Sequence, residues 1–508
     1  MTESTQPGAE HPLLLGIDCG TESIRVLAVD IEGVVRADAR VPHRTTHLHT
    51  GWAEQSPADW WDGLIKAIAE LRLHESDLAR VAAIGVAATS STVVFSDTDG
   101  EPIRPAMLWM DVRATAEAKR IESTKHPVLS LCPDGVSPEW GPAKAAWVSR
   151  HEPDLFAQTD IICEGGDWLI HQLTDKWSAN IPAAATAWFY DVVNSAWPDD
   201  LYRASGLPEL SFKCPTRVLR PGEIAGALLP EIAPLLGLTP GIPVVEGGID
   251  SISAMLAMGV TGDGPAALIT GSSNVILAQS SAAVRARGVW GGYRDAATPG
   301  FELVVGLHNA GTTLAWLTRS VLGGSRTLEQ LESEAREIAP GSEGLIALPD
   351  FQGNRTPFTE PLARGALWGL TFGHGPAHIY RAMLEGIGFA TRHALDAITD
   401  AGVVVTELRA CGGATRSELT MQVYADILGR PVVTTHTADA SALGAAISAS
   451  IGIGLYSDFP KASKRMNRSG RVFTPDPEHR ERYDALYDLF RRTYPALLPL
   501  MRAMANVP

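Results

Sequence analysis

The sequence has little of what marks several large classes of protein. It contains 5 cysteines in 508 residues, and no two of them form a Cys-x-x-Cys pair. This spacing predicts neither a disulfide framework nor a zinc site. The 42 basic residues are outnumbered by 58 acidic ones, which gives a formal net charge of −16. Because a nucleic-acid binder normally carries a basic surplus, we expect no nucleic acid among the partners.

Long apolar runs are also missing. The longest stretch of low charge, residues 440–456, is rich in small residues and predicts a helix able to pack closely, but it falls short of the roughly 20 apolar residues of a membrane span. We therefore expect no membrane partner. The start, "MTESTQPGAEHP", lacks the basic region and apolar stretch of a signal peptide. The sequence thus predicts a disordered tail over residues 1–12 and a cytoplasmic protein.

What the sequence does contain is an ordinary globular composition, 45% hydrophobic and 20% charged, in a chain too long for one core. Two apolar runs, Leu13–Ile17 and Ile24–Val29, flank a short polar tip, and residues 266–280 repeat this strand–turn–strand pattern. Segments with helical spacing lie between such strands, residues 56–73 being a clear example. The repetition predicts a duplicated α/β architecture rather than one open Rossmann sheet, with a boundary near residues 245–260.

Glycine and hydroxyl-bearing residues recur at three turns that could bind phosphate. Glycine lets the backbone N–H groups of a tight turn point outward, and a hydroxyl completes an anion cradle. Asp18, beside the first turn, can hold a hydrated Mg²⁺. A plain hairpin turn is the alternative, and neither G-x-x-x-x-G-K-[ST] nor a G-x-G-x-x-G after a strand is present. The residues of the three turns are Gly20 and Thr21; Gly271, Ser272 and Ser273; and Gly311 and Thr312.

A further glycine-rich segment, "CGGATRSE", follows a strand-like run and opens a helix. Its paired glycines would let a nucleotide lie against the backbone, although a plain strand-to-helix turn uses the same residue types. The candidate nucleotide contacts here are Gly412, Gly413, Ala414 and Ser417.

Asp250 stands after two glycines at the start of a predicted helix. A carboxylate there is often only a helix cap. The functional interpretation is a general base, because phosphoryl transfer needs an acceptor hydroxyl oriented by an acidic side chain.

The segment "MLWMDVRA" combines Trp109, Asp111 and Arg113. An aromatic wall with a carboxylate and a guanidinium suits a polyhydroxyl ligand, because hydroxyls donate to Asp and accept from Arg. A surface Asp–Arg pair beside a core tryptophan is the alternative.

These segments together resemble the FGGY carbohydrate kinases over nearly the whole chain, from Leu13 to about Met466. The most specific likeness is "GALWGLTFGHGPAHIYRAMLE", which is similar to the second family signature at every defined position. "SPEWGPAKAAWVSRHEP" resembles the first signature only loosely: Lys144 fits, whereas Gly141 and Ala145 do not. The positions that match the second signature are Gly365, Leu367, Gly369, Leu370, His378, Ile379, Ala382, Met383, Leu384 and Glu385.

The resemblance implies two ribonuclease-H-like domains of the actin-like sugar-kinase fold, residues 13–248 on the sugar side and 249–508 on the nucleotide side, with a cleft between them. It implies ATP and Mg²⁺ as cofactors, Asp250 as catalytic base and substrate contact, and Asp18 beside the metal. The turns and glycine-rich segment above would bind the nucleotide, and we expect a homodimer. The remaining substrate contacts would be Thr89, Ser90, Trp109, Asp111, Arg113 and Asn309.

The expected reaction is phosphorylation of a terminal hydroxyl on an open-chain sugar or polyol. "VAATSSTVVF" is more similar to ribulokinase-type members than to xylulokinases, so D-ribulose or a similar pentulose comes first. Asn309 stands where ribulokinases commonly have a sugar-contacting Glu, which leaves xylulose and a tetritol or pentitol as rivals. An actin- or chaperone-like ATP-binding protein and a non-catalytic sugar sensor are the competing classes.

Overall fold

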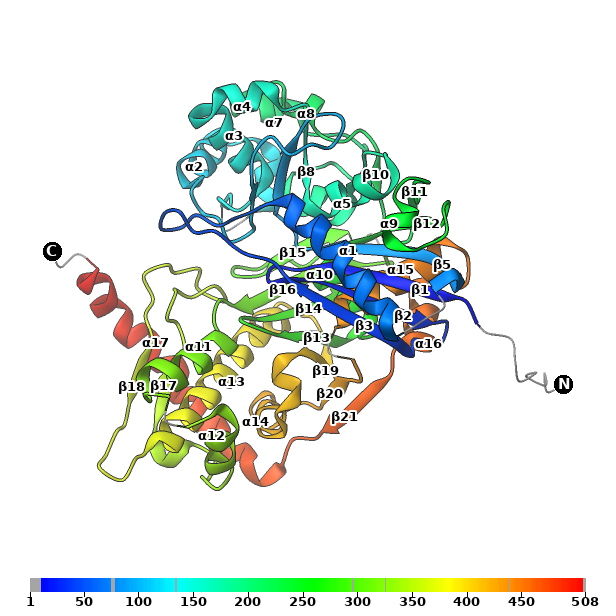
Figure 1. Ribbon diagram of the computed structural model, residues 1–508. Helices are drawn as coiled ribbons and strands as arrows, with labels where there is room; N and C mark the ends of the chain where they lie inside the picture. The colour runs from blue at the N-terminus through cyan, green and yellow to red at the C-terminus, as the bar shows by residue number, and fades with distance from the viewer. Residues whose placement is uncertain are drawn as a thin grey trace. The chain divides into compact units, whose positions relative to one another are not determined.

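The computed structural model describes residues 11–74, 78–132, 135–294, 297–324, 326–437 and 439–505. Most of the predicted tail, residues 1–10, lies outside the described residues. The chain divides into two compact units (Figure 1). Unit 1 is formed by Met1–Gly259, Ala296–Thr298 and Asp439–Asn467, and unit 2 by Val260–Asp295, Pro299–Ala438 and Arg468–Pro508.

Unit 1 is built on a six-stranded mixed sheet in the order β11-β12-β5-β1-β2-β3. The strands β1, β2 and β3 form an antiparallel meander, while β5 and β12 run parallel to β1. The polar tip between the first two apolar runs is therefore the turn of a β-hairpin, as predicted. The strands are β1 (Leu13–Cys19), β2 (Ser23–Asp30), β3 (Val35–Pro42), β5 (Val81–Ala88), β11 (Ile224–Ala227) and β12 (Pro243–Ile249).

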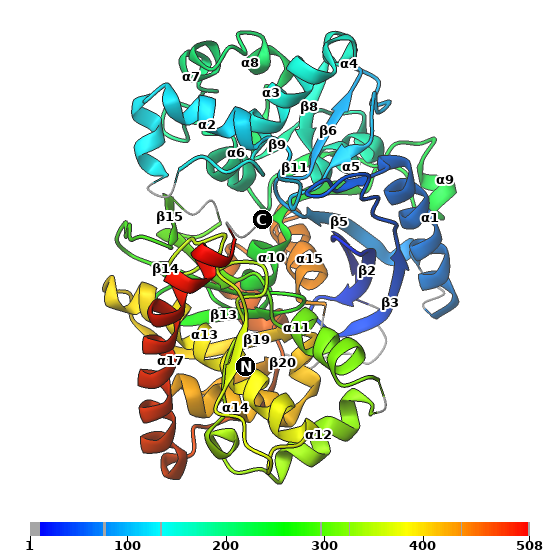
Figure 2. The same cartoon turned by 90° about the vertical axis from the view of Figure 1, so that its left-hand side faces the viewer.

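Helices cover both faces of this sheet. Alternate residues of β1, such as Leu15 and Ile17, share a core cluster with Trp60 and Leu64 of α1. The intervening Gly16 faces α15, which packs on β1, β5 and β12 although it comes far later in the chain (Figure 2). The helices of unit 1 are α1 (Pro57–His74), α2 (Thr115–Ser123), α3 (Gly141–His151), α4 (Pro153–Gln158), α5 (Gly165–Thr174), α6 (Ile181–Ala187), α7 (Asp199–Ala204), α8 (Leu210–Lys213), α9 (Ala233–Leu236), α10 (Asp250–Ala257), α15 (Ala440–Gly452) and α16 (Phe459–Met466).

A second, smaller sheet in unit 1 has its own hydrophobic core, formed with α2, α3 and the helices that follow. Its order is β4-β7-β6-β8. The strands are β4 (Glu54–Gln55), β6 (Val93–Ser96), β7 (Ala106–Met107) and β8 (Ile161–Glu164), with a separate pair formed by β9 (Ala179–Asn180) and β10 (Val218–Leu219).

Unit 2 repeats the topology of the large sheet. Its seven strands follow the order β15-β16-β14-β13-β19-β20-β21, in which an antiparallel meander β13-β14-β16 is extended by the parallel strands β19 and β20. This matches β1-β2-β3 extended by β5 and β12, so the duplicated architecture is confirmed. The seven strands are β13 (Gly264–Thr270), β14 (Asn274–Ser280), β15 (Trp290–Arg294), β16 (Phe301–Leu307), β19 (Val405–Gly412), β20 (Val432–Thr435) and β21 (Ser469–Phe473). A separate pair is formed by β17 (Ile346–Leu348) and β18 (Ala366–Trp368).

The core of unit 2 lies between this sheet and α13, α14 and α17. The last helix, drawn in red in Figure 2, buries an aromatic stripe that includes Tyr483, Tyr487 and Phe490. Among the described residues, no helix combines the length and apolar character needed to cross a membrane. The helices of unit 2 are α11 (Gly311–Trp316), α12 (Leu328–Arg336), α13 (Pro376–Asp400), α14 (Glu418–Leu428) and α17 (Pro477–Met504).

Candidate active site

In unit 1 the ends of three parallel strands bring predicted site residues to one edge of the sheet. Asp18 lies near the end of β1, Thr89 follows β5 and Asp250 follows β12. Because these strands are neighbours and parallel, their carboxyl ends lie side by side. A hydrogen bond from the N–H of Thr89 to the carbonyl of Cys19, 3.2 Å long, joins the first two strand ends.

Asp250 is the first residue of α10 and is partly exposed. Its carboxylate accepts a 2.6 Å hydrogen bond from the N–H of Ser251, and the residue at the cap position is Ile249, so the structure does not support the capping alternative. Burial and then the negative charge of Asp18 raise the pKa of Asp250 to about 7. A carboxyl group with such a pKa can accept a proton near neutral pH, which is what a general base must do.

The neighbouring carboxylate of Asp18 is 1% exposed. Its Oδ2 accepts a 3.0 Å hydrogen bond from Arg25, whereas its buried Oδ1 has no hydrogen-bond partner among the described residues. Burial raises the pKa of Asp18 to about 6, and the charge of Arg25 opposes this shift. A buried, unpartnered carboxylate oxygen fits Mg²⁺, which proteins commonly hold through one or two carboxylates, waters and substrate phosphates. Within the described part of the chain no group of three or more His, Cys, Asp or Glu side chains could hold a metal ion. The site that fits is therefore one in which a single carboxylate, waters and substrate phosphates bind the metal.

The hairpin turn after β1 connects two sets of predicted contacts. The N–H of Gly20 closes the turn on the carbonyl of Ser23 at 3.1 Å. The hydroxyl of Thr21 accepts a 2.9 Å hydrogen bond from the indole N–H of Trp109. This leaves the O–H of Thr21 free to donate, and it joins a predicted phosphate contact to the predicted sugar-binding wall.

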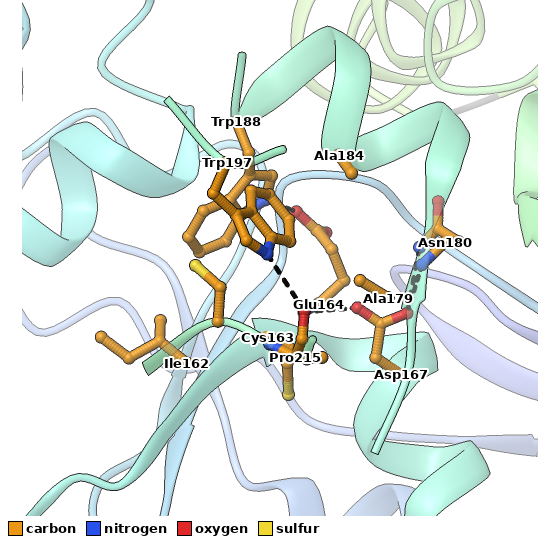
Figure 3. A pocket seen from close by; sticks show the side chains of 11 residues that line it. Ile162, Cys163, Glu164, Asp167, Ala179, Asn180, Ala184, Trp188, Trp197 and Pro215 are labelled. Atoms are coloured by element: carbon orange, nitrogen blue, oxygen red, sulfur yellow. Dashed lines mark hydrogen bonds between the residues drawn. The ribbon is translucent and has the colours of Figure 1, made fainter. Parts of the chain in front are cut away.

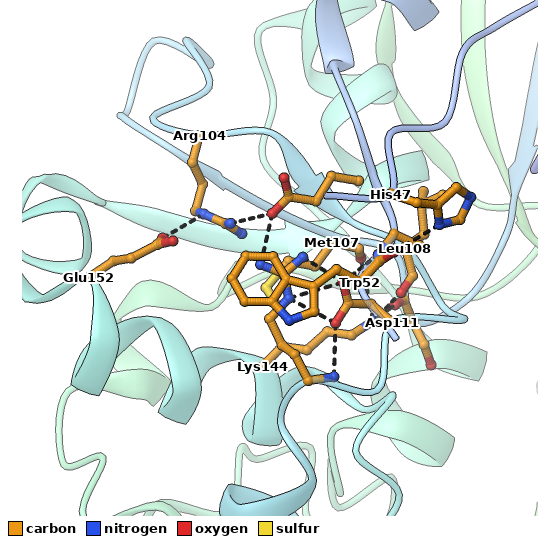
Figure 4. Close-up of polar contacts among 12 residues, drawn as sticks. His47, Trp52, Arg104, Met107, Leu108, Asp111, Lys144 and Glu152 are labelled. Atoms are coloured by element: carbon orange, nitrogen blue, oxygen red, sulfur yellow. Dashed lines mark hydrogen bonds and ion pairs between the residues drawn. The ribbon is translucent and has the colours of Figure 1, made fainter. Parts of the chain in front are cut away.

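Asp111 and Arg113 are held inside unit 1 by polar contacts, and Figure 4 shows Asp111 and Trp52 among them. The Arg113 guanidinium stacks on Trp52 at 3.5 Å, forms a 2.9 Å ion pair with Glu54 and donates to Asp111. The fully buried Asp111 also accepts a 2.7 Å bond from the N–H of Ala53. The side chains of the pair are buried and Trp109 is partly exposed, so the alternative of a surface pair beside a core tryptophan is wrong. The contacts show that the pair supports the fold, and a direct sugar contact of either residue stays a prediction.

The two predicted phosphate turns of unit 2, residues 271–273 and 311–312, are hydrogen-bonded to each other. The carbonyl of Ser272 accepts hydrogen bonds from the N–H of Ala310, at 2.8 Å, and from the hydroxyl of Thr312, at 3.0 Å. The N–H of Gly311 donates to the carbonyl of Gly271 at 3.1 Å. The turn at the tip of the β13–β14 hairpin and the start of α11 are therefore held together, with Gly271, Ser272, Gly311 and Thr312 exposed.

The glycine-rich segment "CGGATRSE", the remaining predicted nucleotide contact of unit 2, begins beside the turn of the β13–β14 hairpin. Gly412 pairs with Thr270 across β13 and β19, has a φ of +95°, and a Cβ there would lie 2.0 Å from the Thr270 carbonyl oxygen. Only glycine fits this close approach. Gly413 and Ala414 follow in a short 3₁₀ turn, and the Ser417 hydroxyl caps α14 by accepting a 3.1 Å bond from the N–H of Thr420.

Asn309, which follows β16, is 6% exposed. Its Nδ2 is buried and has no hydrogen-bond partner among the described residues. A buried amide without an acceptor is costly, so this position favours a ligand oxygen as the missing partner.

Sequence reasoning missed the charged residues that support Asp18. Arg25 of β2 joins Asp18 to Asp439, whose carboxylate lies 3.6 Å from the Arg25 Nε, and Arg40 binds the same carboxylate at 2.7 Å. Arg40 and Asp439 are 399 positions apart, and no local pattern signals such a contact.

Two ribonuclease-H-like domains that carry polar turns and an acidic residue at the carboxyl edges of their sheets define the sugar-kinase class of the actin-like fold. Residues 13–257 match the N-terminal domain, and residues 266–453 the C-terminal domain, of the FGGY family of carbohydrate kinases. The chain belongs to this family, whose members are ATP-dependent phosphotransferases.

Three known proteins show how far the likeness extends. The chain is 30% identical over 498 residues to the xylulose kinase of Escherichia coli K12, covering 96% of this chain and 100% of that protein. It is 30% identical over 533 residues to the ribulokinase of Shouchella clausii, covering 94% of each. The crystal structure of xylulose kinase from Rhodospirillum rubrum superposes with a TM-score of 0.85 at 30% identity, covering 96% of this chain and 100% of that one.

Proposed function

We propose that this protein transfers the γ-phosphate of ATP to a terminal hydroxyl of an open-chain pentulose, with D-ribulose as the first candidate. The observation that carries the proposal is Asp250, a partly exposed carboxylate with a pKa of about 7 beside a second carboxylate at the edge of the unit 1 sheet. The pentulose class is supported by the relatives named ribulokinase and xylulose kinase.

In this proposal Asp250 takes the proton of the sugar hydroxyl while the hydroxyl oxygen attacks the γ-phosphate and the β–γ bond breaks to give ADP. Asp18 would hold Mg²⁺ through its free oxygen, and the metal would neutralise charge on the phosphates. The phosphate donors would be the N–H and hydroxyl groups of the three turns, with the segment around Gly412 on the adenosine side. Most of the rate enhancement then comes from positioning and electrostatic stabilisation.

Among the predicted sugar contacts, Thr89, Ser90 and Trp109 are partly exposed, and Asn309 has a buried Nδ2 without a partner among the described residues. Xylulose is the second candidate, because a xylulose kinase and a ribulokinase match this chain at the same 30% identity. A tetritol or pentitol is the third candidate, because Asn309 stands where ribulokinases commonly have a sugar-contacting Glu.

The predicted division at residues 248/249, the homodimer and the cytoplasmic location stay predictions. Light scattering on the purified protein tests the homodimer directly.

A coupled ADP-release screen over ketopentoses, ketotetroses and alditols tests the function. We expect the highest kcat/KM with D-ribulose, and Asp250→Asn to lose roughly 10²- to 10⁴-fold in kcat. The nucleotide should still shift the melting temperature of this variant, because its binding does not depend on the base. ADP release that ignores added sugar would instead indicate an ATPase of the actin or chaperone class, and full turnover in Asp250→Asn would refute the role of the base.

A further inference from the structure

Lys144 is a fully buried lysine on α3 with 0% exposure. Its ammonium group donates to three main-chain carbonyls, those of Ser91 at 2.6 Å, Leu108 at 2.6 Å and Met107 at 3.3 Å. Figure 4 draws the side chain beside Met107 and Leu108. A buried ammonium is costly unless its donors are satisfied, and here its hydrogen bonds go to the backbone of one turn and of the end of β7 with the turn that follows it.

The first turn, residues 89–92, carries the predicted sugar contacts Thr89 and Ser90. Its Ser91 has a φ of +60°, a left-handed conformation that is unfavourable for a residue with a Cβ. Lys144 holds the carbonyl of Ser91, while the N–H of Thr92 donates to the carboxylate of Glu164 at 3.1 Å. The turn is therefore fixed by the Lys144 ammonium on its carbonyl side and by the Glu164 carboxyl group on its amide side.

The second turn, residues 108–111, carries Trp109. The N–H of Asp111 closes it on the carbonyl of Leu108 at 2.9 Å, and Lys144 donates to the same carbonyl. The orientation of the Trp109 indole, which also holds the hydroxyl of Thr21, thus depends on a backbone that Lys144 anchors.

We propose that Lys144 is a positioning residue for the sugar site: it holds the turns that carry Thr89, Ser90 and Trp109 in one fixed arrangement. The inference rests on the proposed function, because these three residues are its predicted sugar contacts. Lys144 itself is too deeply buried to touch a sugar.

The surroundings of Lys144 support a fixed positive charge. Carboxylates of Glu139, Glu164 and Asp111 face it and oppose the effect of burial and of Arg113, which together lower the pKa of Lys144 to about 8. Glu164 is held in turn, since its Oε1 accepts a 2.6 Å bond from the indole N–H of Trp188 at a small cavity beside Asp167 (Figure 3). The two side chains on either side of the first turn, those of Lys144 and Glu164, are therefore both anchored in the core.

The test compares Lys144→Met with the wild-type protein. Methionine fills the volume but removes the ammonium donor from all three carbonyls, although that of Leu108 keeps another donor, the N–H of Asp111, so the turns should loosen. We expect the KM for the sugar to rise roughly 10- to 100-fold, as displacement of binding groups by about 1 Å would produce. The KM for ATP should change less, because among the described residues Thr21 is the one predicted nucleotide contact that bonds to either turn. Hydrogen exchange at residues 89–92 and 108–111 should become faster, while exchange in α17 stays as in the wild type.

Glu164→Gln is the second variant, and it keeps the proposal testable if Lys144→Met does not fold. An amide cannot accept both of the hydrogen bonds that the carboxylate accepts, so exchange should increase at residues 89–92 but not at 108–111. Tyr202→Phe is the matched control: it removes a buried hydroxyl that donates to the carbonyl of Trp188 at 2.7 Å and touches neither turn. It should lower stability without changing the sugar KM.

Two results overturn the inference: an unchanged sugar KM in Lys144→Met, or unchanged exchange in both turns. A wild-type protein that phosphorylates no sugar or polyol would instead refute the proposed function, and the exchange measurement would still decide whether Lys144 fixes the two turns.

Discussion

At the scale of single residues, the pKa of Asp250 leads to a pH dependence. Burial and the charge of Asp18 raise this pKa to about 7 because both disfavour the ionised form. Only the ionised form can accept the proton of the sugar hydroxyl. We therefore expect kcat to fall about tenfold for each pH unit below 7 and to level off above it. The measurement is kcat at saturating sugar and ATP from pH 5.5 to 8.

The variant Asp18→Asn tests the cause of that shift. It removes the negative charge next to Asp250, so the acid limb of the remaining activity should move to lower pH even if the activity itself is reduced. A kcat that stays constant between pH 5.5 and 8 in the wild type would contradict the assignment of Asp250 as the base.

Asn309 offers a second prediction at this scale. Asn309→Ala removes the buried Nδ2 that has no partner among the described residues. If this donor binds a sugar oxygen, the sugar KM should rise roughly 3- to 10-fold, the equivalent of one neutral hydrogen bond. Initial rates over a range of sugar concentrations measure this. Thr318→Ala, which removes a hydroxyl bonded within its own helix, should leave the KM unchanged; equal KM values in the two variants would show that Asn309 does not contact the sugar.

Residue type alone did not distinguish the carboxylates that could take part in the reaction from those that stabilise the fold. Asp18, Asp111 and Asp250 all stand near polar turns, yet Asp111 is fully bonded inside the protein, whereas Asp18 keeps a free oxygen. Glu385, which ends the most specific family signature, is buried and accepts hydrogen bonds from Gly341, Ser342 and Arg381. That signature identifies the family through a residue of the core, and the sequence holds no signal of which carboxylates are bonded internally.

At the scale of the element, α15 packs on the large sheet of unit 1 without room for a methyl group. A Cβ on Gly16 would lie 1.8 Å from the Ala442 carbonyl oxygen, and one on Gly85 would lie 1.9 Å from that of Ala445. Gly16→Ala should therefore push β1 and α15 apart and lower the free energy of unfolding by about 1–3 kcal/mol or more. Urea unfolding measures the loss, and kcat should fall as well because Asp18 ends the same strand.

The control is Gly262→Ala, since no atom lies within 4 Å of the added methyl group. It should leave stability within about 0.5 kcal/mol of the wild type. A Gly16→Ala variant as stable as this control would show that the strand and helix can separate at little cost.

The hairpins and helices were largely predictable from the sequence. Apolar runs on both sides of a polar tip predicted both hairpins, helical spacing predicted α1, and the sequence also predicted helices at α10, α14 and α15. The small residues of α15 predicted close packing, but they could not show that its partners are β1, β5 and α10, because contacts between distant segments leave no local pattern.

At the scale of the whole molecule, the repeated strand–turn–strand pattern was enough to predict two related sheets, since each repeat carries its own apolar alternation. The return of Asp439–Asn467 to unit 1 was not predictable in this way. This return depends on the ion pairs that Arg25 and Arg40 form with Asp439. It also depends on Gly16 in β1 and Gly85 in β5, because the absence of a side chain at these positions lets α15 pack directly on the strands.

Several carboxyl groups of unit 1 are buried or partly buried, and they make the stability of the protein depend on pH. Burial raises the pKa of Asp167 and Asp250 to about 7 and that of Glu164 to about 8, well above their values of 3.8 and 4.5 in the unfolded chain. Between pH 6.5 and 8 the folded state therefore binds more protons than the unfolded state, so stability must fall as the pH rises. Each excess proton contributes about 1.4 kcal/mol per pH unit.

The midpoint of urea unfolding at pH 6.5, 7.2 and 8, without nucleotide or metal, measures this slope. Two kinds of group act in the opposite direction at the ends of this window. The partly buried His43 and the buried His171, with lowered pKa values, do so near and below their unfolded value of 6.5, and Lys144, with a pKa of about 8, does so near the upper end, so the fall should be clearest around pH 7. Asp167→Asn replaces one of the titrating groups by a neutral amide of the same shape, so its slope should be shallower than that of the wild type. A midpoint that rises from pH 6.5 to 8 would mean that these carboxyl groups are ionised in the folded protein. It would then contradict the raised pKa of Asp250, on which its role as a base near neutral pH rests.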